Sequence, residues 1–390
     1  MAIVITAAGR SPLGALQGSL APLPAPDLAA QVVKELVGRI GVTGTDIDHA
    51  LIGNVLSAGQ GQAPARQVTI KAGLGDSVPA VTLNKMCGSG LETVIQASRL
   101  IGSGEARLVL AGGTESMSNA PYLLPGARAG LRLGDGKIVD SLIHDGLWDV
   151  YNQKHMGSCA ELCAGKYGFT REEQDAFAVR SYERAQAAAA AGDFAAETVN
   201  IQVPGRRGQV TEVSRDEGPD QVNFEKLPTL RPAFEQDGTI TAANASTIND
   251  GAAALFLADG VAARERGWEP LGEIKGWSAH AHEPEWFTTA PVTAMQKLLE
   301  RLDWSAADVD LYEINEAFSV VPLAAMKELD LPADKVNVRG GAVALGHPIG
   351  ASGARILVTL LSALRARGGG RGMASICIGG GEALALAVEV

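Results

Sequence analysis

Several glycine-rich blocks of this sequence carry residues that could do chemistry, and the first surrounds Cys87. This thiol stands in Asn84-Lys-Met-Cys87-Gly-Ser-Gly90, after an apolar run at 81–83 and before a stretch typical of a helix. A thiol beside a helix N-terminus feels a partial positive charge that stabilises its thiolate, the nucleophilic form. The small residues leave room for a carbonyl group to approach backbone amides. The alternative is a buried cysteine that acts as a small hydrophobic residue.

The C-terminal part of the chain offers three more reactive groups. Cys377 precedes the glycines at 379–381, whose uncovered amides suit an oxyanion; the alternative is a β-bulge with a buried thiol. His347 lies between glycines and a proline, where it could be a base, an oxyanion donor or a plain solvated histidine. Asn315 can orient a water molecule or donate to an oxyanion, and Glu316 is either catalytic or an ordinary turn carboxylate.

The other sulfur-bearing and imidazole groups do not suggest a metal. Cys159 and Cys163 are spaced i,i+4 on a predicted helix, which is not Cys-x-x-Cys spacing, and no second Cys or His pair stands at zinc-finger spacing. By default, we expect His155 to be a polar group at the surface and Met156 to be a side chain that fills the core. We therefore expect neither a metal site nor a thioredoxin-like redox site.

The elements that must position these groups alternate between short β-rich runs and helical stretches. This alternation predicts an α/β fold whose sheets are covered by helices. The runs are strands at 81–84, 107–111, 336–338 and 373–378 and helices at 91–101 and 354–367.

An internal repeat indicates two similar halves. The pattern Asp-x-Asp followed four residues later by Ile occurs at 46–52 and again at 308–314. A Ser-Gly pair opens a predicted helix at 89–90 and again at 352–353, at nearly the same offset. If the halves pack about a pseudo-twofold axis, the turns that carry the first thiol and the loop histidine face one another.

The stretch between the halves differs in character, with glycine-rich turns, an Ala-rich helix at 175–191 and a polar run at 205–226. Long loops with little order of their own usually carry function, so we expect a ligand-covering insert. The predicted division is an N-terminal half at 1–118 plus 243–268, an inserted loop domain at 119–242, and a C-terminal half at 269–390.

Composition limits the class of protein. The chain has 390 residues, of which 46% are apolar and 20% charged, enough for a sizeable core. Its net charge is −11 and its basic residues are scattered, which argues against nucleic acid and anionic membranes as partners. We find no window of about 18 apolar residues and no signal-type N-terminus. Four cysteines are too few for a disulfide framework, so we expect a reducing, cytoplasmic location.

Taken together, the blocks resemble the thiolases. The resemblance rests on Asn84–Gly90, Asn315-Glu-Ala-Phe318, Gly346-His-Pro-Ile-Gly350 and Cys377–Gly381, in this order along essentially the whole chain. His155-Met-Gly157 and Asn244-Ala-Ser246 resemble the short-chain, acetoacetyl-CoA type. The resemblance implies a thiolase-like α/β fold of two similar layered halves (α-β-α-β-α) with an inserted loop domain.

The resemblance also implies a mechanism without metal, nucleotide or prosthetic group, with coenzyme A and acetyl-CoA as substrates. Cys87 attacks acetyl-CoA and holds the acetyl group as a thioester, after His347 activates the thiol. Cys377 deprotonates the methyl group of a second acetyl-CoA, and the carbanion attacks the acetyl group. One oxyanion hole is His347 with a water held by Asn315; the other is the backbone N–H groups of Cys87 and Gly379. Losing one such donor costs about 3 kcal/mol of barrier.

Coenzyme A is expected to lie along the insert, where Ser246 hydrogen-bonds a pantetheine amide and Met156 and Phe318 wall a pocket suited to short acyl groups. The implied contacts are Leu147, His155, Met156, Ala233, Phe234, Ala242, Ser246, Ala317 and Phe318.

Some positions depart from the family pattern. Asp220 stands where many relatives have Arg, Glu92 where a basic residue is frequent, and Glu382 where an apolar residue is common. These departures bear on affinity and pH dependence and not on reaction type. The loop at 122–132 resembles one that joins dimers into tetramers, so the expected assembly is a homotetramer, with a dimer as the alternative.

Three other functions were weighed. A ketoacyl synthase of the same fold pairs its cysteine with two histidines, whereas here the partners are Asn315, His347 and Cys377. A broader-range 3-ketoacyl-CoA thiolase differs in acyl range. A catalytically silent acyl-CoA-binding protein has no need of two thiols, so Cys87 and Cys377 together argue for an enzyme.

Overall fold

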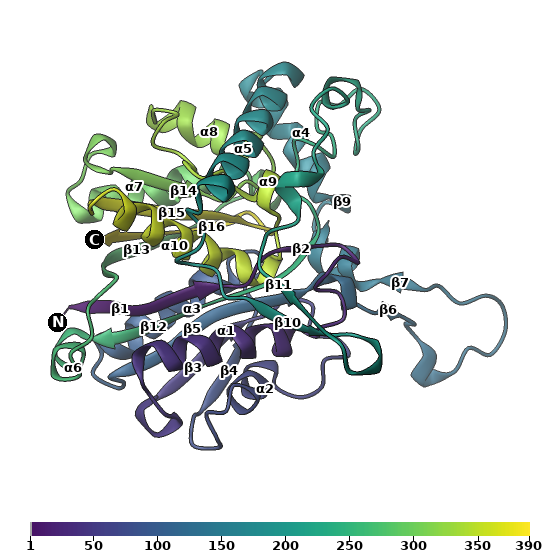
Figure 1. Cartoon of the computed structure of the whole chain (residues 1–390). Helices are drawn as coiled ribbons and strands as arrows, with labels where there is room; N and C mark the ends of the chain where they lie inside the picture. The colour runs from purple at the N-terminus through teal and green to yellow at the C-terminus, as the bar shows by residue number, and fades with distance from the viewer. Residues whose placement is uncertain (1) are drawn as a thin grey trace.

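The computed structural model describes residues 2–390, whose main strands form one ten-stranded sheet (Figure 1). The order is β14-β15-β16-β13-β1-β12-β5-β3-β4, with β2 (Gly14–Ala15) beside β12. The strand bounds are β1 Ile3–Arg10, β3 His49–Gly53, β4 Ala80–Leu83, β5 Leu108–Ser116, β12 Asn249–Asp259, β13 Gly272–Ala281, β14 Leu311–Ile314, β15 Arg371–Ile378 and β16 Glu382–Glu389.

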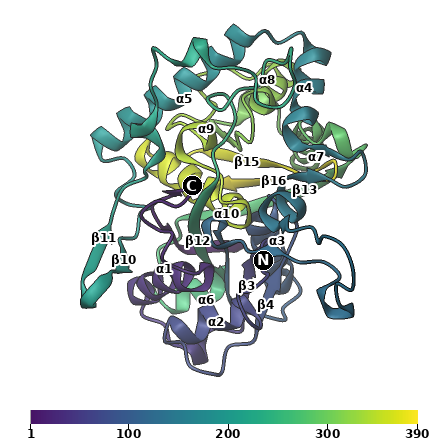
Figure 2. The same ribbon diagram turned by 90° about the vertical axis from the view of Figure 1, so that its right-hand side faces the viewer.

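The sheet consists of two units that meet at a short seam. Only Val4 and Ile5 of β1 pair with β13, whereas β1 pairs with β12 along its full length. Helices α3 and α10 lie between the two units (Figures 1 and 2). The main helices are α1 Ala25–Ile40, α2 Pro64–Lys71, α3 Ser89–Gly102, α4 Met156–Tyr167, α5 Arg171–Ala191, α6 Gly260–Glu265, α7 Ala290–Leu302, α8 Val320–Leu329, α9 Ala342–Leu345 and α10 Ile349–Ala366.

Alternating side chains in the strands build the layers. In β12, Phe256 packs into an apolar cluster with α1 and α2, whereas Leu255 and Leu257 pack with α3 and α10. In β15, Met373 faces α7 and α8, while Ile376 faces α3 and α10. Because each strand exposes one face to each neighbouring helix layer, the result is the five-layer α-β-α-β-α arrangement predicted from the sequence.

The Asp-x-Asp repeats form equivalent structures. In each one, a 3-10 turn is closed by a capping box, Thr43 with Asp46 in the first and Ser305 with Asp308 in the second. The second Asp of each repeat then accepts a hydrogen bond from the backbone at the start of the neighbouring strand, at Leu108 or Arg371. The repeats therefore anchor β3 beside β5 and β14 beside β15.

The Ser-Gly repeats mark the place where α3 and α10 cross. A Cβ atom added at Gly90 would lie 2.7 Å from the backbone nitrogen of Ala354, and one at Gly353 would overlap the backbone nitrogen of Leu91. Only glycine permits so close an approach. The N-terminal turns of both helices therefore lie against each other, as the predicted pseudo-twofold arrangement requires.

One predicted strand is wrong. Residues 336–338 form only an isolated bridge between Val336 and Tyr312, because Asn337 adopts a left-handed backbone with φ of 48°. Its side-chain amide accepts a hydrogen bond from the N–H of Ile314 and donates one to the C=O of the same residue. A side chain thus takes the place that strand backbone would hold beside β14.

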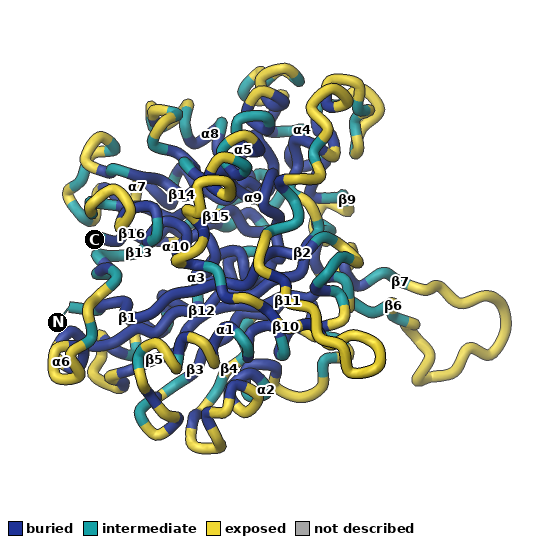
Figure 3. The backbone as a smooth tube through the Cα atoms, in the orientation of Figure 1, coloured by how far each residue is buried: buried dark blue, intermediate teal, exposed yellow. Residues whose placement is uncertain are grey.

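The segment between the halves contains more regular structure than a loop. Helices α4 and α5 lie over the C-terminal half (Figure 2), and α5 begins at Arg171, before the predicted start of the Ala-rich helix. The strands β6 (Tyr122–Leu123) and β7 (Val139–Asp140) pair in an arm that projects from the body and is largely exposed (Figures 1 and 3). The domain boundaries given above stay a prediction.

Helix α10 is long and apolar enough to cross a membrane by length and composition, although Arg355 and Arg365 interrupt its apolar sequence. In this fold, however, 83% of that stretch is buried between the two units of the sheet. It is therefore the central core helix.

Candidate functional site

Cys87 lies in a strained turn between β4 and α3. Met86 has a left-handed backbone with φ of 47°, unusual for a residue with a side chain. The turn is fixed by the Asn84 side chain, which accepts from the N–H of Met86 at 2.9 Å. It is fixed again by Ser89, whose Oγ accepts from the N–H of Lys85 at 2.8 Å and donates to the C=O of Met86 at 2.7 Å. The sulfur of the thiol is thereby held just before the helix.

Burial dominates the acidity of this thiol. It raises the pKa of Cys87 to about 11, although the N–H groups of Gly379 and of Cys87 itself donate toward the sulfur and act in the opposite direction. The helix N-terminus predicted a stabilised thiolate, but loss of water outweighs that local field. The resting group is therefore a thiol, and it needs a base before it can attack.

Cys377 faces the site from the second half of the molecule. It is fully buried near the end of β15, in the apolar cluster that contains Met156 and Phe318. Burial raises the pKa of its thiol well above the ordinary value, and negative charge on Cys87 raises it further. The two sulfurs thus lie within electrostatic reach of each other, with the N–H of Gly379 directed toward the first.

His347 is buried and held in one tautomer. Its Nδ1 atom lies 2.6 Å from Ser352 Oγ, whose own proton goes to the C=O of Pro348 at 2.9 Å. The hydroxyl must then accept from Nδ1–H, which leaves the lone pair on Nε2 free. Burial, and secondly the charge of Arg355, lowers the pKa of His347 to about 3. The imidazole is therefore neutral and able to act as a base.

Asn315 and His347 are neighbours, as predicted. The Nδ2 atom of Asn315 lies 3.5 Å from Nε2 of His347. Asn315 directly follows β14, and its backbone N–H donates to the C=O of Ser375. Its Oδ1 atom is buried and accepts no hydrogen bond from residues 2–390. A buried amide with a free acceptor is suited to hold a water molecule, which can in turn donate to a substrate oxygen.

Glu316 is an anchor and not a free catalytic group. Its buried carboxylate accepts hydrogen bonds from Ser181 Oγ at 2.7 Å, Asn337 Nδ2 at 2.8 Å and the N–H of Val343 at 3.1 Å. These bonds occupy both oxygens and tie the Asn315 turn to α5 and α9. Burial raises its pKa.

Sequence reasoning missed Glu115, a buried carboxylate at the seam between the halves. It accepts from the Asn54 side chain at 2.9 Å and from three backbone N–H groups, including that of Gly350 at 3.0 Å. Burial raises its pKa to about 7, and its charge raises the pKa of Cys87. The signal available in the sequence was a lone acidic residue at the end of an apolar strand.

Most of the predicted coenzyme A contacts lie together. His155 stacks on Phe234 with ring centroids 4.8 Å apart, and Phe234 meets Phe318 edge-on at 6.0 Å. The N–H of Ser246 donates to the C=O of Ala317 at 2.9 Å. Met156 belongs to the same cluster as Phe318, and Leu147 to the cluster against which Cys87 packs. Ala233 and Ala242 are exposed on the loop that joins these groups.

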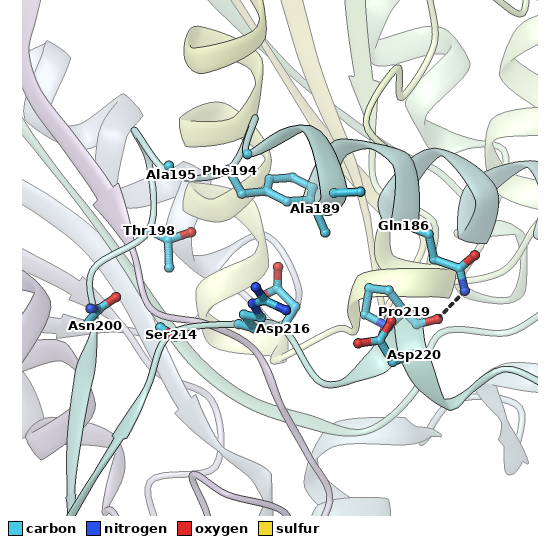
Figure 4. A pocket seen from close by; sticks show the side chains of 13 residues that line it. Gln186, Ala189, Phe194, Ala195, Thr198, Asn200, Ser214, Asp216, Pro219 and Asp220 are labelled. Atoms are coloured by element: carbon cyan, nitrogen blue, oxygen red, sulfur yellow. Dashed lines mark hydrogen bonds between the residues drawn. The ribbon is translucent and has the colours of Figure 1, made fainter.

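The departures from the family pattern have partners or stay at the surface. Glu382 forms an ion pair with Lys85, two residues before Cys87, and Glu92 bonds Gln96 on its own helix. Asp220 lines a pocket of about 490 Å³ that none of the predicted site residues lines (Figure 4). Asp216 in this pocket is fully engaged by Arg10.

All four cysteines are free thiols, and Cys159 and Cys163 are buried in α4. Among residues 2–390, no group of three or more His, Cys, Asp or Glu side chains is placed to hold a metal ion.

Comparison with known proteins decides the family. Residues 3–260 match the family described as "Thiolase, N-terminal domain", and residues 268–390 match "Thiolase, C-terminal domain". The chain belongs to the thiolase family. Among its curated relatives, this thiolase is 50% identical over 388 residues to an acetyl-CoA acetyltransferase of Cupriavidus necator, which covers 99% of both chains. It is 50% identical over 390 residues to the acetyl-CoA acetyltransferase of Chromobacterium violaceum, covering 100% of both.

Solved structures agree with this assignment. The thiolase fold described above matches a thiolase from Ascaris suum in complex with coenzyme A, with a TM-score of 0.95, 44% identity and coverage of 100% of both chains. It also matches the Bacillus anthracis acetyl-CoA acetyltransferase with a TM-score of 0.97 and 42% identity, covering 100% of this chain and 98% of the other.

Proposed function

We propose that this thiolase is an acetyl-CoA acetyltransferase whose chemistry is carried by Cys87, His347, Cys377 and Asn315. It condenses two acetyl-CoA molecules reversibly to acetoacetyl-CoA and CoA through an acetyl-cysteine intermediate. The observation that carries the proposal is that a partly buried thiol, Cys87, and a fully buried thiol, Cys377, come from opposite halves and lie within electrostatic reach of each other, with the Gly379 N–H directed at the first. An acyl-CoA-binding protein without catalysis has no use for this pair.

The acylation step begins with His347. Its free Nε2 lone pair takes the proton from the Cys87 thiol, and the thiolate attacks the carbonyl carbon of acetyl-CoA. The bond between that carbon and the sulfur of CoA breaks, and the departing sulfur takes its proton from the Cys377 thiol, which leaves Cys377 as a thiolate and His347 protonated on Nε2. Cys87 packs against the apolar cluster of Ile349, two residues after His347, which supports this exchange. The N–H groups of Cys87 and Gly379 stabilise the oxyanion.

The condensation step uses Cys377 as the base. The high pKa of its thiol means that its thiolate, once formed, is strong enough to remove a proton from the methyl carbon of a second acetyl-CoA. The enolate charge is met by the Nε2–H of the protonated His347 and by a water held on Asn315. The carbanion attacks the acetyl carbon, the thioester bond to Cys87 breaks, the Cys87 sulfur takes the proton back from His347, and acetoacetyl-CoA leaves.

We further propose that the acyl range is short and that the assembly is a homotetramer. Met156 and Phe318 belong to the same apolar cluster as Cys377, and the Met156 sulfur lies 3.5 Å from a Cβ atom built at Gly379, which favours a short acyl group. The arm between β6 and β7 exposes large apolar side chains, with Leu133 fully exposed and Ile138 and Tyr122 about 70% exposed, as expected of a surface that binds other subunits.

Free thiols suit a reducing, cytoplasmic location.

The deciding experiment measures acetoacetyl-CoA loss with and without free CoA. The wild type is expected to cleave acetoacetyl-CoA only when CoA is present, and Cys87→Ala is expected to lower the rate by at least about a thousandfold. Cys159→Ala, which removes a buried thiol in α4, serves as the matched control and should keep most of the activity. Cleavage that survives in the Cys87 variant would place the nucleophile elsewhere, and no CoA-dependent cleavage by the wild type would overturn the proposed activity.

A further inference from the structure

The loop that carries four of the nine predicted coenzyme A contacts is closed on itself by hydrogen bonds. It runs from Ala233 to Ser246, and the N–H of Ala233 donates to the C=O of Ile240 at 2.8 Å. Phe234 projects from this loop onto Gly157, where a Cβ atom would overlap the ring. The loop therefore presents its aromatic side chain to the start of α4 in one fixed position.

A carboxylate on α4 holds one part of this loop, which Gln174 and Asp175 of α5 also bond through Thr239 and Asn244. Glu161 accepts from the N–H of Thr239 at 2.9 Å, from Thr239 Oγ1 at 2.9 Å and from the N–H of Ile240 at 2.7 Å. Gly238 has no side chain at the place where the Glu161 carboxylate lies, since a Cβ atom there would overlap it. Bonds from backbone N–H groups to a carboxylate are stronger than bonds between neutral groups.

The bonded network continues from Glu161 to the predicted pantetheine contact. The C=O of Thr239 accepts from Asn244 Nδ2 at 3.0 Å, and the C=O of Asn244 accepts from the N–H of Ser319 at 2.9 Å. Two residues further on, the N–H of Ser246 bonds the C=O of Ala317. The whole surface is thus linked to α4 by backbone and side-chain bonds, without a contact between Glu161 and any of the four reactive groups.

We propose that Glu161 is a positioning residue for coenzyme A, which fixes the 233–246 loop in its binding geometry and leaves the chemical step alone. This inference rests on the proposed function and adds a residue that acts through the loop. When the loop is already ordered in the free enzyme, the ligand does not bear the entropic cost of ordering it. Loss of the Glu161 bonds restores this cost, and every substrate that carries coenzyme A then binds more weakly.

The test uses Glu161→Gln in the full-length enzyme, because glutamine keeps the volume but replaces an acceptor oxygen with a donor. Calorimetry with free CoA should show a Kd raised by about tenfold, and steady-state kinetics should show a similar rise in KM for acetyl-CoA with kcat within about threefold of wild type. Alkylation of Cys87 by iodoacetamide, a small reagent that does not use the loop, should keep its wild-type rate. Glu183→Gln, a change of the same charge at an exposed position of α5 outside the loop, should leave all three quantities unchanged.

Each outcome is decisive. A Glu161→Gln enzyme with wild-type Kd and KM overturns the positioning role while leaving the thiolase function intact. An equal loss of kcat and of the alkylation rate assigns Glu161 to general folding of the site and also overturns it. A wild type that binds no CoA overturns the proposed function itself, and Glu161→Asp gives a second variant should the glutamine protein fail to fold.

Discussion

At the scale of single residues, burial decides how the reactive groups behave. The pKa of Cys87 is raised to about 11 and that of His347 is lowered to about 3, both chiefly by loss of water. At neutral pH the resting pair is therefore a thiol beside a neutral imidazole. The proton therefore moves from Cys87 to His347 during catalysis and not in the resting enzyme. The tautomer of His347 determines whether this transfer can begin.

Ser352 sets that tautomer, and its removal gives the first residue-scale prediction. Ser352→Ala takes away the acceptor for Nδ1–H, and we expect kcat for acetoacetyl-CoA cleavage to fall by about tenfold or more as the ring loses its orientation. The matched control is Ser98→Ala, a buried serine on α3 whose Oγ bonds only the C=O of Val94 in its own helix. Equal kcat losses in the two variants would refute the role of Ser352.

At the scale of elements, two turns from different halves are joined by one ion pair. Lys85 precedes the nucleophile in the turn before α3, and Glu382 begins β16 after the glycines that follow Cys377. The sequence marked Glu382 as a departure from the family pattern, and its partner explains its presence. Both side chains are partly exposed, so the pair is worth no more than about 1 kcal/mol.

The ion pair should act on the alignment of the two turns, which a charge exchange can test. Lys85→Ala and Glu382→Ala are each expected to lower kcat/KM by about twofold to fivefold. The exchanged double variant, Lys85→Glu with Glu382→Lys, should recover most of that loss at low salt. The pairing would be contradicted if the loss of kcat/KM in the exchanged double variant equalled the combined losses of the single variants Lys85→Glu and Glu382→Lys. Arg107→Ala, which breaks an exposed pair with Glu265, is the control.

Element boundaries show what the sequence could predict and why it failed in places. The predicted helix at 91–101 and the strand at 373–378 agree closely with α3 and β15. Helix α10 begins at Ile349, five residues before the prediction, because its first turns contain Gly350 and Gly353. Glycine is unfavourable in a helix by itself, and tertiary packing against Thr114 and Leu91 requires it here.

The sequence alone could predict the candidate reactive residues of the site, but not the carboxylates that hold the neighbouring backbone in place. Cys87, His347 and Cys377 stand in short blocks of unusual composition, so sequence pattern identifies them. Glu115 and Glu161 stand among ordinary residues, and their partners are 59 or more positions away. Such roles depend on long-range hydrogen bonds, which local pattern does not encode.

At the scale of the whole molecule, the crossing of α3 and α10 joins the halves into one structure. The two helices share an apolar cluster with strands of both sheet units. Their backbones approach each other at Gly90 and Gly353, near the turns that carry Cys87 and His347. Interiors are close-packed, so a single added methyl group at the crossing has no free space.

Enlarging that crossing should destabilise the whole enzyme. Gly90→Ala is expected to lower the free energy of unfolding by about 1–3 kcal/mol, because the methyl group meets backbone atoms of α10 that cannot move aside independently. Gly38→Ala in α1, where a Cβ atom meets nothing within 4 Å, is the matched control and should raise stability by up to about 1 kcal/mol. Thermal unfolding of both variants measures the difference, and equal shifts would contradict this account.

The same crossing has a consequence during protein synthesis. Helix α3 ends at residue 102, but α10, which covers its inner face, is complete only at residue 366. At a translation speed of roughly 5–20 residues per second, the apolar side of α3 waits on the order of ten to fifty seconds for its partner to emerge from the ribosome. Until then, the nascent N-terminal half exposes an apolar helix face that the finished protein buries.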